Sequence, residues 1–482
     1  MHFSDAALYY IPVQTRVPLV FGNRTVESVV VLRVGLTVRF AGGRSATGWG
    51  EVPLNTAWAW PDGEPGGAAG GETDRATARK VEILQRLAEK IATGIVPGEC
   101  PPDPFRAYRE VLEPLAAGIS ADSAGEEPKA PGARRQNLPV SAVRLVLSAF
   151  DLAVFDLFGM VHDEPSFGAL DSRRMTMDLG EWVKDDPVMR RRLKNLYPAQ
   201  VFTARPKPLL NAWHLVGGAD TIASSNGGPD DDREKRSESA GIDVPRSLDA
   251  WVRRDGIDRV KVKLSGLDVS TAITRYLDVV RTVAPLGVHR VSVDFNGTLS
   301  GERDLIRFLE GVGSDCGACC SVLRMVEQPF AAIGEPIPAG LPACAADVLF
   351  SADESVTSWQ DVISAHDARM DGVVLKTAKT LSEMIPALAV ARSLEMDVFV
   401  QDLTNPMLAL IAHAAFAGAA GGEWGVEVNA TQFYPHASGP EEQVHPGLFR
   451  RRNGCIDIST ITGPGIGYRI DEIARTLPVR AV

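Results

Sequence analysis

The stretch that decides the fold runs from Val260 to Lys376, and one pattern occurs in it five times. A short apolar run ends each time on a charged side chain: Arg259-Val-Lys-Val-Lys263, Val291-Ser-Val-Asp294, Val322-Leu-Arg-Met-Val-Glu327, Val348-Leu-Phe-Ser-Ala-Asp353 and Val373-Val-Leu-Lys376. A lone charge is costly inside a buried strand, so these charges are expected at strand ends. Successive charges lie 23 to 33 residues apart, which suits a repeated strand-helix unit. The pattern predicts parallel strands whose carboxyl ends share one barrel mouth, where catalytic residues gather.

The repeat extends beyond this stretch in both directions. Helices are expected over 269–284, 301–311, 358–369, 380–394 and 406–419, and further strands over 397–402 and 424–428. Two candidates remain for the first barrel strand, Pro208–Val216 and Thr221–Ser224.

The N-terminal part follows other patterns. Short apolar runs over 8–40, punctuated by glycines that include Gly48 and Gly50, predict a three-stranded antiparallel meander. Helices are expected over 74–118, and a polar linker over 118–137.

Two further segments complete the expected organisation. Residues 140–159 are apolar on most faces, which predicts a helix buried between domains. The tail over 452–468 is expected to leave the barrel and to pack on the meander.

Composition excludes several classes of protein. The net charge of −11 argues against a nucleic-acid partner, and no apolar run reaches the length expected of a membrane span. The N-terminus shows no signal-peptide pattern, and six cysteines in 482 residues are too few for a disulfide framework. A cytoplasmic location is therefore expected. Cys316-Gly-Ala-Cys319-Cys320 lacks a second Cys/His pair at a suitable distance, which disfavours zinc.

Three of the strand-end charges are carboxylates: Asp294, Glu327 and Asp353. Carboxylates brought close together repel one another unless a cation lies among them. Oxygen ligands with open positions suit Mg²⁺. The alternative is a buried ion-pair network with the neighbouring lysines.

Lys263 and Lys376 flank these carboxylates along the expected strand order. An ammonium close to a divalent cation has its charged form disfavoured, so its pKa is expected to fall toward that of a base at neutral pH. Two such bases could remove a proton from one face of a substrate and return it to the other. Lys261 points the same way as Lys263 in a strand, so it is expected to assist. A structural ion pair is the alternative role for Lys376.

These motifs resemble the enolase superfamily, in its muconate lactonizing enzyme-like subgroup within the mandelate racemase/muconate lactonizing enzyme family. The matching segments are Lys261-Val-Lys263, Asp294-Phe-Asn296, Glu327-Gln-Pro-Phe330, Asp353-Glu-Ser355, Leu375-Lys-Thr-Ala-Lys379, Ser148–Gly159 and Gly463-Pro-Gly-Ile-Gly467. The family's mandelate-racemase subgroup requires a histidine at the seventh strand, where this chain has Gln401-Asp402.

The resemblance implies an α/β fold, a modified TIM barrel (β/α)7β with an α+β capping domain built from both ends of the chain. Residues 1–140 would form the N-terminal part of the cap, 141–435 the barrel with an insertion at 160–245, and 436–482 the C-terminal return to the cap. It also implies a metal site of Asp294, Glu327 and Asp353 for Mg²⁺, with Mn²⁺ as an alternative. Lys263 and Lys376 would be the acid/base pair.

The implied activity is removal of the α-proton of a small-molecule carboxylate to give a metal-stabilised enediolate. A racemase or epimerase that uses two opposed lysines is the leading expectation. A cycloisomerase, a syn-dehydratase similar to o-succinylbenzoate synthase, and a non-catalytic carboxylate-binding relative remain alternatives. Members of this family commonly associate, so a homo-oligomer is expected.

Specificity is expected from capping loops near 20–28 and 54–62 and from the last strand ends. The candidate substrate-binding or supporting residues are Asn296, Glu354, Gln401, Asp402, Glu427, Asn429, Phe21 and Trp58. Trp58, beside a glycine-rich stretch at 61–71, could belong to a lid or to ordinary surface packing. Residues 431–434 are expected at the same rim.

Overall fold

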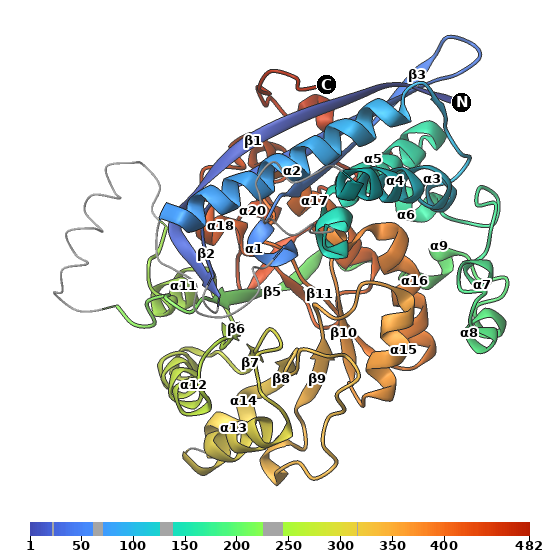
Figure 1. Ribbon diagram of the computed structural model, residues 1–482. Helices are drawn as coiled ribbons and strands as arrows, with labels where there is room; N and C mark the ends of the chain where they lie inside the picture. The colour runs from blue at the N-terminus through green and yellow to red at the C-terminus, as the bar shows by residue number, and fades with distance from the viewer. Residues whose placement is uncertain (22–23, 61–70, 126–137, 225–243, 316) are drawn as a thin grey trace.

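Eight parallel strands close into a barrel in the second half of the chain (Figure 1). They are β5 (Leu209–Val216), β6 (Arg259–Lys263), β7 (Arg290–Asp294), β8 (Leu323–Glu327), β9 (Leu349–Ala352), β10 (Gly372–Leu375), β11 (Asp397–Val400) and β12 (Val426–Glu427). Pairing of β12 with β5 closes the ring. This computed structural model describes residues 1–21, 24–60, 71–125, 138–224, 244–315 and 317–482. The predicted barrel is confirmed.

Helices connect the strands in the order that the sequence predicts. They are α11 (Leu248–Asp255), α12 (Val269–Val283), α13 (Glu302–Asp315), α14 (Gly317–Val322), α15 (Trp359–Asp367), α16 (Leu381–Ser393) and α17 (Met407–Ala419). The segment between β8 and β9, described throughout, contains only the 3-10 turn Ala343–Ala345. The first barrel strand is β5, whereas Thr221 forms only an isolated bridge with Ser247.

The N-terminal meander forms as predicted and gains a short fourth strand. Its strands are β1 (His2–Phe21), β2 (Arg24–Arg39), β3 (Ser45–Pro53) and β4 (Gly98–Glu99), in the sheet order β3-β2-β1-β4. The helices of this region are α1 (Thr56–Ala59), α2 (Gly71–Ile95), α3 (Pro104–Ala107), the π-helix Tyr108–Leu112 and α4 (Glu113–Gly125). Figure 1 shows α2 lying along β1 above the barrel. The linker expected over 118–137 is wrong for its first part, because α4 continues to Gly125; residues 126–137 lie outside the described chain.

The long helix α5 (Val140–His162) joins the cap to the barrel. Its length and composition are those of a membrane-spanning helix, contrary to the expectation that no apolar run is long enough, but 83% of its most apolar window is buried inside the protein. Strand β3 packs directly on it. A Cβ atom on Gly48 or Gly50 would collide with the backbone of α5, so these glycines allow close contact rather than a turn.

Asp151 of α5 is fully buried and holds α16. Its carboxylate accepts hydrogen bonds from the Ser382 backbone N–H (3.0 Å) and hydroxyl (2.6 Å). Burial raises the pKa of Asp151 to about 7, against the lowering effect of these hydrogen bonds.

Asp151→Asn is expected to flatten the pH dependence of stability. The folded pKa lies above the ordinary 3.8, so the stability from this proton is full below pH 4 and is lost as pH rises toward 7. The slope removed is roughly 1.4 kcal/mol per pH unit. An asparagine can keep both hydrogen bonds to Ser382, because its oxygen accepts from the backbone N–H and its amide nitrogen donates to the hydroxyl oxygen. Chemical unfolding between pH 4 and 8 measures this, with exposed Asp185→Asn as control; an unchanged slope contradicts it.

Short elements fill the insertion and the tail. They are α6 (Ser166–Ala169), α7 (Leu179–Trp182), α8 (Pro187–Arg192), α9 (Pro198–Val201), α18 (Ala430–Phe433), α19 (Gly439–Val444), α20 (Pro446–Phe449), β13 (Cys455–Asp457) and the 3-10 turn Ile470–Glu472. Residues 225–243 of the insertion lie outside the described chain.

Only the last part of the C-terminal tail reaches the meander. Strand β13 pairs antiparallel with β5, so this part of the tail stays on the barrel, contrary to expectation. The chain then reaches the cap, where Arg480 binds Asp5 and the Ala481 N–H donates to Leu8 O at 2.9 Å.

Charges from the tail also complete a cluster inside the cap. Arg33 of β2 is 1% exposed and binds Glu51 of β3 at 2.5 Å and Glu441 of α19 at 3.2 Å. Glu441 in turn binds Arg475 at 2.5 Å. A buried guanidinium is stable only when its charge is matched, so the tail is part of the cap core.

Cysteine chemistry gives no firm indication of compartment. Cys100, Cys320, Cys344 and Cys455 are free thiols, whereas Cys319 is disulfide-bonded. Cys316 of the quoted cysteine motif lies outside the described residues.

Candidate active site

The three predicted carboxylates lie side by side at the carboxyl ends of adjacent strands. Asp294 and Glu327 end β7 and β8 and are paired in register, and Asp353 follows β9 directly. All three have no exposed surface. Parallel pairing therefore gathers three buried negative charges at one mouth of the barrel.

Lys261 lies at the centre of these charges. Its side chain points into the barrel and is 2% exposed. The ammonium is 2.8 Å from Glu327 Oε1, 3.1 Å from Asp294 Oδ2 and 3.3 Å from Glu427 Oε2, and it donates to Gln401 Oε1 at 2.7 Å. One ammonium thus pairs with three carboxylates at once.

Lys263 and Lys376 lie on the two flanks of this group. Lys263 binds Asp294 and lies 3.4 Å from Asn296 Oδ1. Lys376 binds Asp353 Oδ2 at 2.6 Å, with its ammonium 5.6 Å from the centre of the Trp58 ring. The ion-pair network considered as the alternative to a metal site is therefore present, and it uses the same residues.

The pKa shifts reflect burial first and pairing second. Burial opposes the charge on Asp294, but the ammonium groups of Lys263 and Lys261 together outweigh it and lower the pKa of that carboxyl. Burial and then the Asp294 charge raise the pKa of Glu327 well above its ordinary value. Burial opposes the ammonium of Lys376, but the carboxylates of Asp353, Glu354 and Glu327 together outweigh it and raise the pKa of Lys376. The pKa of Lys376 was expected to fall because a metal cation was assumed to be its neighbour. Its direct partner here is a carboxylate, which favours the charged ammonium, so the pKa rises instead.

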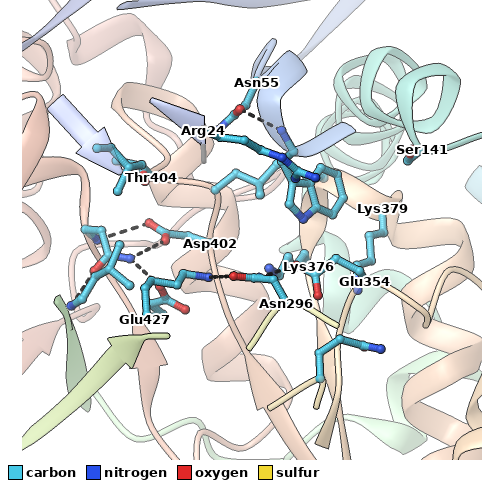
Figure 2. Close-up of a pocket in the computed structure, with 18 of the residues that line it drawn as sticks. Arg24, Asn55, Ser141, Asn296, Glu354, Lys376, Lys379, Asp402, Thr404 and Glu427 are labelled. Atoms are coloured by element: carbon cyan, nitrogen blue, oxygen red, sulfur yellow. Dashed lines mark hydrogen bonds between the residues drawn. The ribbon is translucent and has the colours of Figure 1, made fainter. Parts of the chain in front are cut away.

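A cavity of about 320 Å³ lies above this network, between the cap and the barrel mouth (Figure 2). The cap and α5 contribute Leu19, Arg24, Asn55, Trp58, Ser141 and Arg144. The barrel contributes Leu215, Lys261, Lys263, Asn296, Gly297, Gln328, Ala331, Glu354, Thr357, Lys376, Ala378, Lys379, Asp402, Leu403, Thr404, Glu427 and Asn429. Both lysines of the predicted pair therefore reach a space that can hold a small molecule.

The structure brings most of the candidate specificity residues to this cavity. Asn296, Glu354, Asp402, Glu427, Asn429 and Trp58 line it. Gln401 lies below it, donating from Nε2 to Glu327 Oε2 at 2.6 Å. Phe21 ends β1, but its side chain lies outside the described part, as do residues 61–70 of the proposed lid.

Two acidic side chains, Asp402 and Glu427, line the side of the cavity near the last two strands, and the Asn429 amide links them. Asn429 donates from Nδ2 to Asp402 Oδ1 at 3.0 Å and to Glu427 Oε1 at 2.6 Å. Burial, and then the charge of Glu427, raise the pKa of Asp402 to about 7. Glu427 already has an ammonium partner in Lys261.

Residues 431–434 are not at the cavity rim, contrary to expectation. None of them lines the cavity; Gln432 donates to Leu215 O at 2.9 Å, and Phe433 and Tyr434 are buried against β1. The short helix α18 turns these side chains away from the mouth.

Sequence reasoning missed three residues of the site. Lys379 binds Asp353 Oδ1 at 2.9 Å and Asp353 O at 2.6 Å. Gln328, with a left-handed φ of 39°, accepts from the Asp353 N–H at 2.7 Å. Arg24, at the start of β2, faces the cavity from the cap (Figure 2). Lys379 and Gln328 lie inside motifs quoted above. A charged or polar side chain so close to a strand end was the sequence signal that could have placed them in the site.

The carboxylate group is suited to a divalent cation. Among the described residues, no three His, Cys, Asp or Glu side chains are arranged as a ready metal-ligand set. The ammonium of Lys261 lies 3.1 Å from Asp294 and 2.8 Å from Glu327. The donors themselves fit: Asp294, Glu327 and Asp353 are hard oxygen ligands without exposed surface. Glu354 Oε2 is also buried without a hydrogen-bond partner in the described chain.

The sequence of the barrel matches a known family. Residues 243–474 fit the family described as enolase C-terminal domain-like. The match begins after β5 and covers the other barrel strands, β6 to β12. The resemblance drawn from the motifs is confirmed. None of the curated proteins matches the chain.

Solved enolase-superfamily structures share the whole fold. The dipeptide epimerase from Enterococcus faecalis complexed with Mg and L-Leu-L-Tyr has a TM-score of 0.60 and 13% identity, over 97% of this chain and 99% of that one. The N-succinyl Arg/Lys racemase from Bacillus cereus has a TM-score of 0.57 and 15% identity, over 98% of this chain and 99% of that one. The muconate lactonizing enzyme from Pseudomonas fluorescens complexed with muconolactone has a TM-score of 0.56 and 14% identity, over 96% of this chain and 95% of that one. At such identities the likeness establishes the fold.

Proposed function

We propose that this protein is an Mg²⁺-dependent racemase or epimerase that removes the α-proton of a small carboxylate substrate. The observation that carries the proposal is the placement of Lys263 and Lys376. They lie at the ends of β6 and β10, and the three carboxylate-bearing strand ends lie between them in the sheet order. Two ammonium groups therefore approach one cavity from opposite sides.

The two lysines would act as a pair of acid and base. One, as the neutral amine, accepts the α-proton from one face of the substrate. The other, as the ammonium, donates a proton to the opposite face, so the product is the other stereoisomer and the proton count is unchanged. A positioned acid or base contributes typically about 10² to 10⁴-fold to such a reaction.

The carboxylates would hold the metal. Asp294, Glu327 and Asp353 are the proposed ligands, and Mg²⁺ bound there would stabilise the negative charge that develops on the substrate carboxylate. Two neighbours would keep these ligands in place: Lys379 through Asp353, and Gln401 through Glu327.

The comparisons support the reaction class. The similar structures include racemases, epimerases and cycloisomerases, and two dipeptide epimerases are complexed with Mg. A cycloisomerase or syn-dehydratase would use the same group of residues. The opposed lysines favour racemisation or epimerisation, because inversion needs a group that can transfer a proton on each face of the substrate.

Exchange of the α-proton with solvent deuterium tests the proposal. The protein would be incubated in D₂O with N-acyl amino acids, dipeptides and acid lactones, with Mg²⁺ or with a chelator. We expect deuterium at the α-carbon of at least one class, with inversion, and its loss with the chelator. Exchange without inversion would favour the cycloisomerase alternative. No exchange in any class with Mg²⁺ present would overturn the enzyme proposal.

A further inference from the structure

A second, smaller cavity lies behind the first barrel strand. Its volume is about 20 Å³. Leu215 of β5 lines the active-site cavity, whereas His214 and Val216 point to the opposite face of the strand and line this one. Arg16 of β1 covers it from the cap, and Arg246 borders it from the segment that precedes α11. The cavity therefore lies at the junction of cap and barrel, outside the site described above.

Three buried N–H donors of the lining residues have no acceptor in the described chain: Arg16 Nε, Arg246 Nε and His214 Nδ1. The remaining nitrogens of Arg16 are engaged, Nη1 with Val244 O at 3.2 Å and Nη2 with Pro245 O at 2.9 Å. Buried donors without an acceptor are rare and costly.

The tautomer of His214 follows from its neighbour. Gln432 Nε2 donates to Leu215 O at 2.9 Å and lies 3.3 Å from His214 Nε2. Since an amide nitrogen can only donate, His214 Nε2 must accept, and its proton is on Nδ1. His214 is 2% exposed, and burial, followed by the charge of Arg451, lowers its pKa well below the ordinary value. It is therefore a neutral N–H donor.

The charge around the cavity is positive. Arg16 and Arg246 line it against one carboxylate, Asp220. Burial, and then repulsion from Arg246, lower the pKa of Arg16 to about 10. Arg254 and Arg451 lie close by, over the ring of the lining residue Trp251 at 4.4 and 4.9 Å. Both bind Asp255, at 2.8 and 3.0 Å, so the four arginines face two carboxylates among the described neighbours, Asp220 and Asp255, and the balance is still positive.

We infer that this cavity binds a small inorganic anion of the chloride type. A water molecule accepts two hydrogen bonds and must donate two, whereas an anion can accept from all three N–H groups and offsets the excess positive charge. The cavity has room for a monatomic ion. The anion would join strand β1 of the cap to strand β5 of the barrel, so it stabilises their junction.

Crystals of the full chain grown in bromide test this assignment. We expect an anomalous peak within hydrogen-bonding distance of Arg16 Nε, Arg246 Nε and His214 Nδ1. An ordered water, or no density, at this position would overturn it.

Melting temperatures provide the second measurement. At equal ionic strength, sodium chloride is expected to raise the melting temperature above its value in sodium gluconate, saturably with concentration. Arg246→Gln is expected to remove this difference, while Arg253→Gln, exposed on α11, keeps it. Equal melting temperatures in the two salts for the unmodified chain, or an unchanged difference in Arg246→Gln, would contradict the proposal.

Discussion

Replacing Lys376 by alanine is expected to slow stereoinversion by about 10² to 10⁴-fold, and replacing Lys263 should have the same effect. Each change removes one of the two groups that move a proton, and inversion needs both. The substrate is the one identified by deuterium exchange. Lys90→Ala, on the exposed side of α2, is the matched control and should retain full activity.

The two variants should differ in the exchange that remains. A single lysine can still remove and return the proton on its own face, so each variant should exchange the α-proton of one stereoisomer only. The two variants should prefer opposite stereoisomers. Full inversion activity in either variant would overturn the two-base scheme, as would exchange of both stereoisomers by the same variant.

Lys261→Met is expected to cost the protein about 3 to 5 kcal/mol of unfolding free energy. Methionine keeps most of the apolar stem but removes the ammonium that lies 2.8 to 3.3 Å from Glu327, Asp294 and Glu427. Three buried carboxylates are then left to repel one another. Urea unfolding at pH 8 measures the loss, and exposed Lys90→Met serves as the control.

The loss in Lys261→Met should depend on pH. The pKa of Glu327 is already raised by burial and by Asp294, and removal of the ammonium raises it further. A carboxyl whose folded pKa is raised favours the folded state at low pH, and that contribution is lost as pH rises through the folded pKa. The deficit should therefore shrink from pH 8 to pH 5. An equal deficit at both values would show that lost packing, not charge, is the cause.

The barrel and its charged residues were readable from the sequence because the signal is local. A charge that closes a short β-branched run marks a strand end by itself, so Lys263, Asp294 and Glu327 could be placed before any contact was known. Even spacing then supplied the topology.

The missed features depend on contacts between distant segments. Gly48 and Gly50 look like turn residues, and only the approach of α5 shows that they make room for a helix. Arg24 lies in the capping loop near 20–28 that the resemblance placed at the site, but no local pattern singled out its side chain. The path of the tail was half wrong for a related reason: pairing of β13 with β5 requires an open strand edge at a position that the sequence does not reveal.

The return of the C-terminal tail to the cap has a consequence for synthesis of the chain. The buried Arg33–Glu51 pair needs Glu441, and Asp5 and Leu8 of β1 are bound by Arg480 and Ala481. On the ribosome, the strands β1 to β3 emerge long before Glu441, Arg480 and Ala481 are translated. The cap therefore reaches its final form only after these residues have left the ribosome, so the newly made N-terminal sheet needs protection from aggregation until then.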